Sequence, residues 1–135
     1  GLVRSRGRGD VYKRQLLGRL DEISPETTVV LEISHTQLQY TDRSPAIAAV
    51  TNVTPNHLDQ FDWDAYVELK HHLLKYQKAV DARVINADDP VSRPWASEGS
   101  GRVFLASATG DHGKPGAWLD GPEVVIRGED GKRLA

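Results

Sequence analysis

Two short apolar runs, each ending in polar residues, most constrain what this chain can fold into. Residues 27–33 (TTVVLEI) and 46–53 (AIAAVTNV) are rich in β-branched or small side chains and do not alternate between apolar and polar positions. Such continuous runs are typical of strands in a parallel sheet with both faces covered. Glu32 lies near the end of the first run, and residues 52–57 end and follow the second. Because such sheets bind ligands beyond the carboxyl ends of their strands, we expect both polar groups at one edge.

Residues 62–76 are predicted to form an amphipathic helix. Asp62 suits the N-cap, and apolar side chains recur at helical spacing along one side. Lys70 falls in the middle of that apolar side. Two interpretations stay open: the stem packs while the ammonium reaches water, or the amine is desolvated and has a lowered pKa. A neutral amine of the second kind can react with CO₂ to form a carbamate, a negatively charged group that binds metals.

The rest of the chain continues the alternation of strands and helices. Its expected elements are a helix end at 16–23, strands at 82–86 and 102–106, and a short helix or turn at 91–98. Residues 117–119 and 123–127 flank the turn formers Asp120, Gly121 and Pro122, which predicts a β-hairpin. The pattern as a whole predicts an α/β fold, with a doubly wound parallel sheet and a C-terminal β-hairpin.

Residues 1–15 show neither helical nor strand periodicity, and we expect them to be disordered and separate from a domain formed by residues 16–135. Five of their six charged side chains are basic. One interpretation is a basic arm that binds nucleic acid. The favoured one is a non-native segment, because GRGDVYKRQ resembles translated adapter sequence. The chain has no methionine, and we expect it to be an internal piece of a longer protein.

Composition argues against several classes of protein. The absence of cysteine excludes disulfides and thiolate metal sites. No apolar run approaches the ~18 residues that a membrane-spanning helix needs. Apart from its basic start the chain is acidic, which argues against a nucleic-acid surface. We therefore expect a cytoplasmic protein with no membrane and no nucleic-acid partner.

Besides Lys70, two side chains could carry chemistry. Glu32 ends an apolar strand, where an acid can hold Mg²⁺ or cap a neighbouring helix. His57 lies in a loop, where it can bind a metal or simply form hydrogen bonds. Residues 113–115 (GKP) resemble the end of a phosphate-binding P-loop, but they lack the spacer and the Ser or Thr that such a loop requires. We therefore predict no P-loop in this chain.

Four blocks, in this order, resemble the Mur ligase family, whose members are ATP-dependent enzymes that add amino acids to the peptidoglycan precursor. The blocks are VVLEISHTQLQ, AAVTNVTPNHLDQF, DAYVELKHHLLKYQ and VINADDP. The forms EIS-x-x-QL and TNVTPNHLD are most similar to the D-glutamate-adding subfamily. His35 and Thr36 depart from that subfamily, which usually has Ser and Phe there, and the pair Ser34–His35 resembles the subfamily that adds the third residue.

The resemblance implies roles for residues at matching positions. The chain would be part of the family's P-loop NTPase-like central domain, without its first portion. Glu32 would bind Mg²⁺ and His57 a second Mg²⁺, while Lys70 would be carbamylated and would position that second ion. His57 and Lys70 would thus be the catalytic residues. Ser34 and Gln37 would line the substrate side, and residues 86–90 would be mainly structural.

The resemblance also implies a reaction. ATP, with two Mg²⁺ ions, would phosphorylate a carboxylate of a UDP-muramoyl substrate, and D-glutamate would attack the acyl phosphate to form an amide. We expect the parent enzyme to be a monomer and this piece alone to be inactive, because its P-loop is missing. Two alternatives stay open: another Mur ligase or a folylpolyglutamate synthase, and a non-catalytic α/β binding module with a basic arm.

Overall fold

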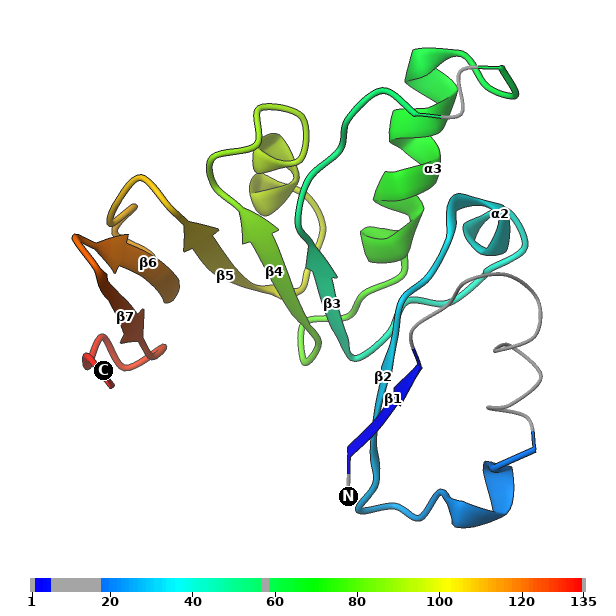
Figure 1. Cartoon of the computed structure of the whole chain (residues 1–135), viewed down its shortest axis with the longest axis horizontal. Helices are drawn as coiled ribbons and strands as arrows, with labels where there is room; N and C mark the ends of the chain where they lie inside the picture. Colours follow the sequence, from blue (N-terminus) through cyan, green and yellow to red (C-terminus); the bar gives the residue numbers. More distant parts are fainter. Residues whose placement is uncertain (1, 6–17, 57–58, 135) are drawn as a thin grey trace. The chain divides into compact units, whose positions relative to one another are not determined.

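The computed structural model describes residues 2–5, 18–56 and 59–134, and its contacts divide the chain into two compact units, Gly1–Ser34 and His35–Ala135 (Figure 1). The first unit has a two-stranded parallel sheet of β1 (Leu2–Ser5) and β2 (Thr28–Leu31), with a 3₁₀ turn, η1 (Leu20–Glu22), between them. β2 confirms a strand within residues 27–33. It is not covered on both faces as expected, because Val30 and Leu31 are exposed, and it is not in the sheet that contains residues 47–50.

β1 lies within residues 1–15, for which we expected no regular structure. The boundary predicted after residue 15 falls among residues 6–17, outside those that the structure describes. The division into residues 1–15 and 16–135 therefore stays a prediction.

The second unit contains a five-stranded sheet in the order β3-β4-β5-β6-β7 (Figure 1). Its strands are β3 (Ile47–Val50), β4 (Ala82–Asn86), β5 (Arg102–Ser107), β6 (Gly116–Asp120) and β7 (Glu123–Arg127). The first four run parallel, and β7 pairs antiparallel with β6. The predicted α/β fold, with a mostly parallel sheet and a C-terminal hairpin, is confirmed.

The main helix, α3 (Trp63–Lys75), begins where the sequence predicts, because the carboxylate of Asp62 accepts a hydrogen bond of 2.8 Å from the N–H of Ala65. A short helix, α2 (His35–Leu38), lies where the sequence predicts no helix. A 3₁₀ helix, η2 (Arg93–Ser97), follows β4 as expected. Within the described ranges, no helix is both long enough and apolar enough to cross a membrane.

The core of this unit lies on one face of the sheet, against α3 and η2. Ile85, on β4, has no exposed surface. The buried residues packed around it are Ala48, Val53, Tyr66, Leu74 and Trp95. Contact with α3 and η2 therefore holds β3 and β4 in place and fixes the loops that follow them.

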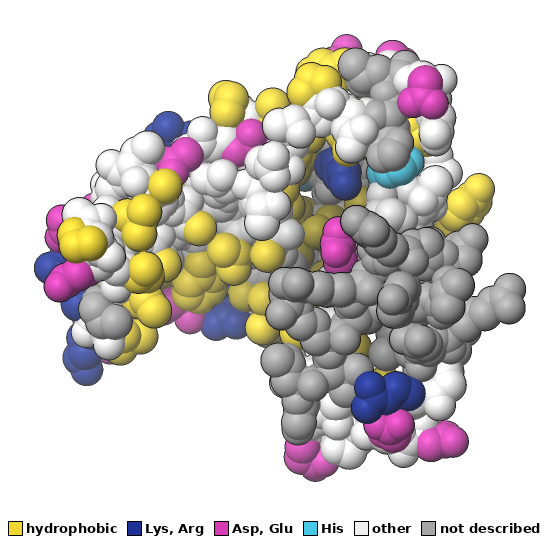
Figure 2. Space-filling view, viewed as in Figure 1, with side chains coloured by type: hydrophobic (Ala, Val, Ile, Leu, Met, Phe, Trp, Pro, Cys, Tyr) yellow, Lys and Arg dark blue, Asp and Glu magenta, His cyan; other side chains and the backbone are white. Residues whose placement is uncertain are grey.

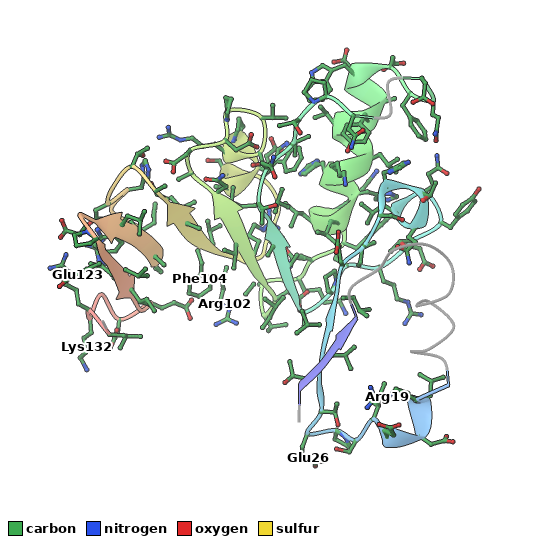
Figure 3. All side chains as sticks on the ribbon, in the orientation of Figure 1. Arg19, Glu26, Arg102, Phe104, Glu123 and Lys132 are labelled. Carbon is green, nitrogen blue, oxygen red and sulfur yellow. The ribbon has the colours of Figure 1, made fainter. Side chains whose placement is uncertain are left out.

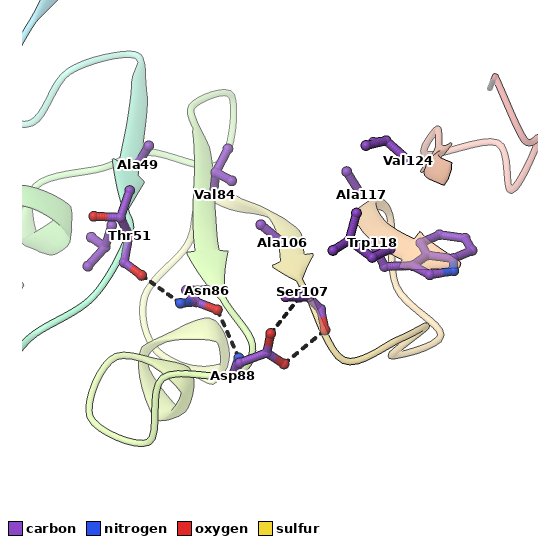
Figure 4. Close-up of a pocket in the computed structure, with 13 residues that line it drawn as sticks. Ala49, Thr51, Val84, Asn86, Asp88, Ala106, Ser107, Ala117, Trp118 and Val124 are labelled. Carbon is purple, nitrogen blue, oxygen red and sulfur yellow. Dashed lines mark hydrogen bonds between the residues drawn. The ribbon is translucent and has the colours of Figure 1, made fainter. Parts of the chain in front are cut away.

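The opposite face is not covered by any described element of the second unit. Small and apolar side chains, including Ala49, Val84, Ala106 and Val124, line a shallow trough with a volume of about 390 Å³ (Figure 4). Figure 2 shows hydrophobic side chains gathered over these strands. Phe104 lies on the same side of β5 as Arg102, two residues earlier, as strand geometry requires (Figure 3).

Candidate functional site

The carboxyl ends of β3, β4 and β5 meet at one edge of the sheet, and polar residues occupy that edge. Asn86 ends β4, and its side-chain N–H donates to the carbonyl oxygen of Thr51, just past β3, at 2.7 Å. Its side-chain oxygen accepts from the N–H of Asp88 at 2.9 Å. Asn86 therefore joins the end of β3 to the turn that follows β4 (Figure 4).

Asp88 joins that turn to the end of β5. One carboxylate oxygen accepts from the hydroxyls of Ser107 (2.8 Å) and Thr109 (2.6 Å), and the other accepts from the N–H of Ala108 (2.6 Å). These bonds, led by that of Thr109, lower the pKa of Asp88 from 3.8 to about 2. The carboxylate is therefore ionised at neutral pH and already engaged with the chain's own donors.

Asp89, the next residue, is buried and holds a different pair of segments. Its Oδ2 accepts from the N–H of Ser92 at 2.8 Å, the hydroxyl of Ser92 at 2.5 Å and the N–H of Val53 at 3.3 Å. Ser92 precedes η2, and Val53 lies in the loop after β3. Asp89 thus fixes the start of the loop that follows β3.

His112 completes the cluster without making it a hydrolytic triad. Its Nε2 lies 3.2 Å from the hydroxyl oxygen of Ser107 and 3.6 Å from Oδ1 of Asp88. In a triad the carboxylate would bind the other ring nitrogen and leave the serine hydroxyl to the histidine. Here Ser107 donates directly to Asp88. The arrangement stabilises a loop and does not activate a nucleophile.

Lys70 lies half-buried on α3, among aromatic side chains. Its Nζ is 5.5 Å from the centroid of the Tyr66 ring, a distance typical of a cation–π contact. Tyr66 is buried, with Trp63 stacked on it at 6.2 Å and the ring of His35 on α2 at 6.0 Å. These surroundings reduce the hydration of the amine, and its role stays a prediction.

The other predicted site residues are distributed between the two units. Glu32, which is exposed, and Ser34, which is half-buried, follow β2 in the first unit, whereas Gln37 lies half-buried in α2 of the second. His57 lies outside the described residues. The convergence of Glu32, His57 and Lys70 on one metal cluster therefore stays a prediction.

Within the described ranges, no three His, Cys, Asp or Glu side chains are grouped as ligands of one ion would be. This finding does not test the predicted site, because His57 lies outside the described residues and lysine is not among the residue types considered.

Comparison with known proteins adds an independent finding. The family model of the Mur ligase middle domain matches residues 13–119, which is most of the chain. The chain belongs to the Mur ligase middle domain family. The four sequence blocks that resembled the family, from VVLEISHTQLQ to VINADDP, all lie inside the matched residues.

Several similar proteins carry the same name. The chain is 43% identical over 132 residues to the UDP-N-acetylmuramoylalanine–D-glutamate ligase of Symbiobacterium thermophilum, covering 93% of this chain and 29% of that protein. Proteins of the same name from Acetivibrio thermocellus (43% over 93 residues, 68% of this chain and 20% of the relative) and Clostridium perfringens (34% over 116 residues, 85% and 25%) are also similar. The chain thus spans less than a third of the length of these Mur ligases.

The bonds at the strand ends agree with the prediction that residues 86–90 are mainly structural, because Asn86, Asp88 and Asp89 hold the loops there. Two adjacent acids directly after a strand end, with Ser92 three residues beyond Asp89, were a readable signal for a capping interaction. The bonds of Asp88 to residues 107–109 had no such signal, because they join segments about 20 residues apart.

Proposed function

We propose that this chain is part of an ATP-dependent ligase that adds D-glutamate to UDP-N-acetylmuramoyl-L-alanine during peptidoglycan synthesis. The observation that carries the proposal is the 43% identity, over 93% of the chain, to a relative named for that reaction. ATP would phosphorylate the terminal carboxylate of the substrate, and the amine of D-glutamate would displace the phosphate to form an amide. Because these relatives are more than three times longer, we assign the activity to a longer protein and expect the 135-residue chain alone to be inactive.

Within that enzyme we assign Glu32, His57 and Lys70 to a site for two Mg²⁺ ions, in which Glu32 binds the first ion and His57 and Lys70 hold the second. Mg²⁺ prefers oxygen ligands, and the Glu32 carboxylate is of that kind. The free amine of Lys70 is not, but its reaction with CO₂ forms an N–C bond, releases a proton and produces a carbamate with two oxygens. The half-buried position of Lys70 supports this assignment, because reduced hydration disfavours the charged amine. The cation–π contact with Tyr66 acts in the opposite direction, since it favours the charged amine.

Bound Mg²⁺ would neutralise phosphoryl oxygens as charge moves between them. Ser34 and Gln37 would contact the UDP-muramoyl substrate. The bonds of Asp89 hold the start of the loop after β3 at Val53, four residues before His57 in the sequence. We expect the enzyme to act in the cytoplasm, where ATP is made.

A second candidate differs only in the amino acid added. His35 and Thr36 stand where the D-glutamate-adding subfamily usually has Ser and Phe, which favours a Mur ligase that adds another residue. His35 packs beside Tyr66, 6.0 Å between ring centroids, so this difference lies close to Lys70 within the second unit.

A chimera tests both candidates. Residues 16–135 would replace the matching segment of the Symbiobacterium thermophilum ligase and, in parallel, of a ligase that adds the third residue. We expect ADP release that depends on the amino acid only in the D-glutamate recipient. Activity only in the other recipient would favour the second candidate, and a folded chimera inactive in both would contradict the proposal.

Lys70→Ala in the active chimera tests the metal site. We expect activity to fall about 10- to 100-fold, a loss typical of disturbed metal positioning, and short carboxylates to restore part of it. Lys75→Ala is the matched control, since Lys75 is on the same helix but exposed and paired with Glu68 at 3.8 Å. Equal activity of the two variants would remove Lys70 from the site.

A further inference from the structure

Four aromatic side chains pack together between α2 and the start of α3. The ring of His35 on α2 lies 5.7 Å from that of Phe61 and 6.0 Å from that of Tyr66, between centroids. Trp63 stacks on Tyr66 at 6.2 Å, with 26° between the ring planes. Tyr66 is buried in the core of the unit. The rings packed against Tyr66 therefore hold its face in one orientation.

Lys70 follows Tyr66 by four residues, which places both side chains on one side of α3. Its Nζ lies over the Tyr66 ring, 5.5 Å from the centroid. The face of an aromatic ring carries partial negative charge, so it attracts an ammonium group. The contact with Tyr66 thus gives the end group of Lys70 a defined position.

The same ring face acts differently on a carbamate. Carbamylation of Lys70 replaces a positive end group by a negative one, and the face that attracts the first repels the second. Tyr66 cannot easily turn aside, because Trp63 and His35 pack against it. The ring therefore directs a carbamate on Lys70 away from the aromatic side chains.

We propose that Tyr66 is a positioning residue, which directs the carbamate of Lys70 to the side where it binds Mg²⁺. This inference rests on the proposed function, because it requires a carbamylated Lys70 that holds a metal ion. It adds a residue that does not touch the metal. It also makes a specific claim: the charge of the ring face at position 66, and not only its size, determines the affinity for Mg²⁺.

The contact itself is tested on this chain by nuclear magnetic resonance with ¹³C-labelled lysine. The ring current of Tyr66 should shift the ε protons of Lys70 to lower frequency, whereas those of the exposed Lys75 should be unshifted. Tyr66→Phe keeps the ring and should retain the shift. Lys70→Arg assigns the resonance, and the amide spectrum reports whether each variant is folded. An unshifted Lys70 resonance in the unmodified chain would overturn the proposal.

The charge of the ring face is tested in the active chimera. Phenylalanine and pentafluorophenylalanine at position 66 have nearly the same shape, but the fluorine atoms make the ring face positive. The fluorinated ring should attract the carbamate and draw it away from the metal. We expect the Mg²⁺ concentration for half-maximal activity to rise about tenfold, as for residues that orient metal ligands, with an unchanged KM for the UDP-muramoyl substrate. Equal Mg²⁺ requirements for the two side chains would show that Tyr66 only fills the core, and would overturn the proposal.

The carbamate gives a readout that does not depend on activity. In ¹³C-bicarbonate its carbonyl signal should appear with either ring at position 66 and should be absent in Lys70→Arg. Mg²⁺ should shift this signal at about tenfold higher concentration when the ring is fluorinated. The same two side chains at position 76 are the matched control, since Tyr76 is 41% exposed and packs on His72 at 5.2 Å. They should leave the Mg²⁺ dependence unchanged.

The possible failures can be told apart. The absence of a carbamate signal from Lys70, or full activity of Lys70→Ala, would overturn the metal-site assignment and this inference with it. A carbamate that forms and responds equally to Mg²⁺ beside either ring would overturn this inference alone. A loss of Mg²⁺ affinity in Tyr66→Phe as large as that with the fluorinated ring would assign the effect to the hydroxyl, and would also overturn it.

Discussion

Ile85 and Val84 are neighbours on β4, yet their side chains enter opposite faces of the sheet and have different surroundings. Ile85 is fully buried against the side of the sheet that carries α3 and η2. Val84 is half-buried and lines the trough of the open face, among Ala49, Ala106 and Ala117. Both residues have aliphatic side chains. The difference therefore shows that an apolar pattern identifies a strand but does not identify which of its faces another element covers.

The direction in which the strands follow one another explains why the faces differ. β3, β4 and β5 lie side by side in chain order. Crossovers between parallel strands are right-handed, so successive connections in one direction pass over the same face. α3 and η2 are the helical parts of these two connections, and both pack on the face of Ile85. Covering the other face requires connections that advance in the opposite direction.

The largest effect expected from this comparison is that of truncating Ile85. Ile85→Ala should lower the free energy of unfolding by about 2–5 kcal/mol, since it leaves a cavity in a close-packed core. Val84→Ala is the control on the same strand, and it should cost less than about 1.5 kcal/mol because its side chain is partly solvated. Urea unfolding of both variants measures the difference, and equal losses would show that both faces are covered in solution.

Asp88 and Asp89, the two acids after β4, also differ in environment, since Asp89 is buried and Asp88 is exposed. Asp89 accepts three hydrogen bonds in the buried region of η2, whereas Asp88 lines the edge of the open trough. Asp89→Ala should cost about 1–3 kcal/mol, because the N–H groups of Val53 and Ser92 lose a buried acceptor. Asp88→Ala should cost less, since water can replace the carboxylate. Urea midpoints that rank these variants in reverse order would contradict this reasoning.

Asp88 should also make the free energy of unfolding depend on pH in the acidic range. Its pKa in the folded chain is about 2, below the ordinary 3.8, so the ionised carboxylate favours the folded state. That contribution is complete above about pH 4 and disappears as the pH falls through about 2. Asp88→Asn should therefore flatten the fall in urea midpoint between pH 4 and pH 2, and carboxyl ¹³C shifts should report the titration. An ordinary pKa for Asp88 would show that its bonds to residues 107–109 do not persist.

Local sequence patterns predicted much of the fold and less of the site. The period of the apolar residues and the cap Asp62 located α3, and continuous apolar runs located the strands. Helix α2 was missed because four residues are too few for a periodic signal. The partners of Arg83 could not be predicted, since they are carbonyl oxygens 12 and 15 residues away that only the folded η2 brings together. Long-range bonds of this kind leave no pattern in the sequence.

The smallest predicted effect tests the open face itself, and β7 offers a matched pair for it. Val124 is 56% exposed beside the trough, whereas Val125 is 5% exposed on the other side of the strand. Val124→Thr should change the free energy of unfolding by no more than about 0.5 kcal/mol and should reduce the fluorescence of an apolar dye bound to the chain. Val125→Thr should cost about 1–3 kcal/mol, because it buries a hydroxyl, and should leave dye binding unchanged. A Val124→Thr variant as unstable as Val125→Thr would mean that the trough is filled in solution, and the two faces would then differ only in what covers them.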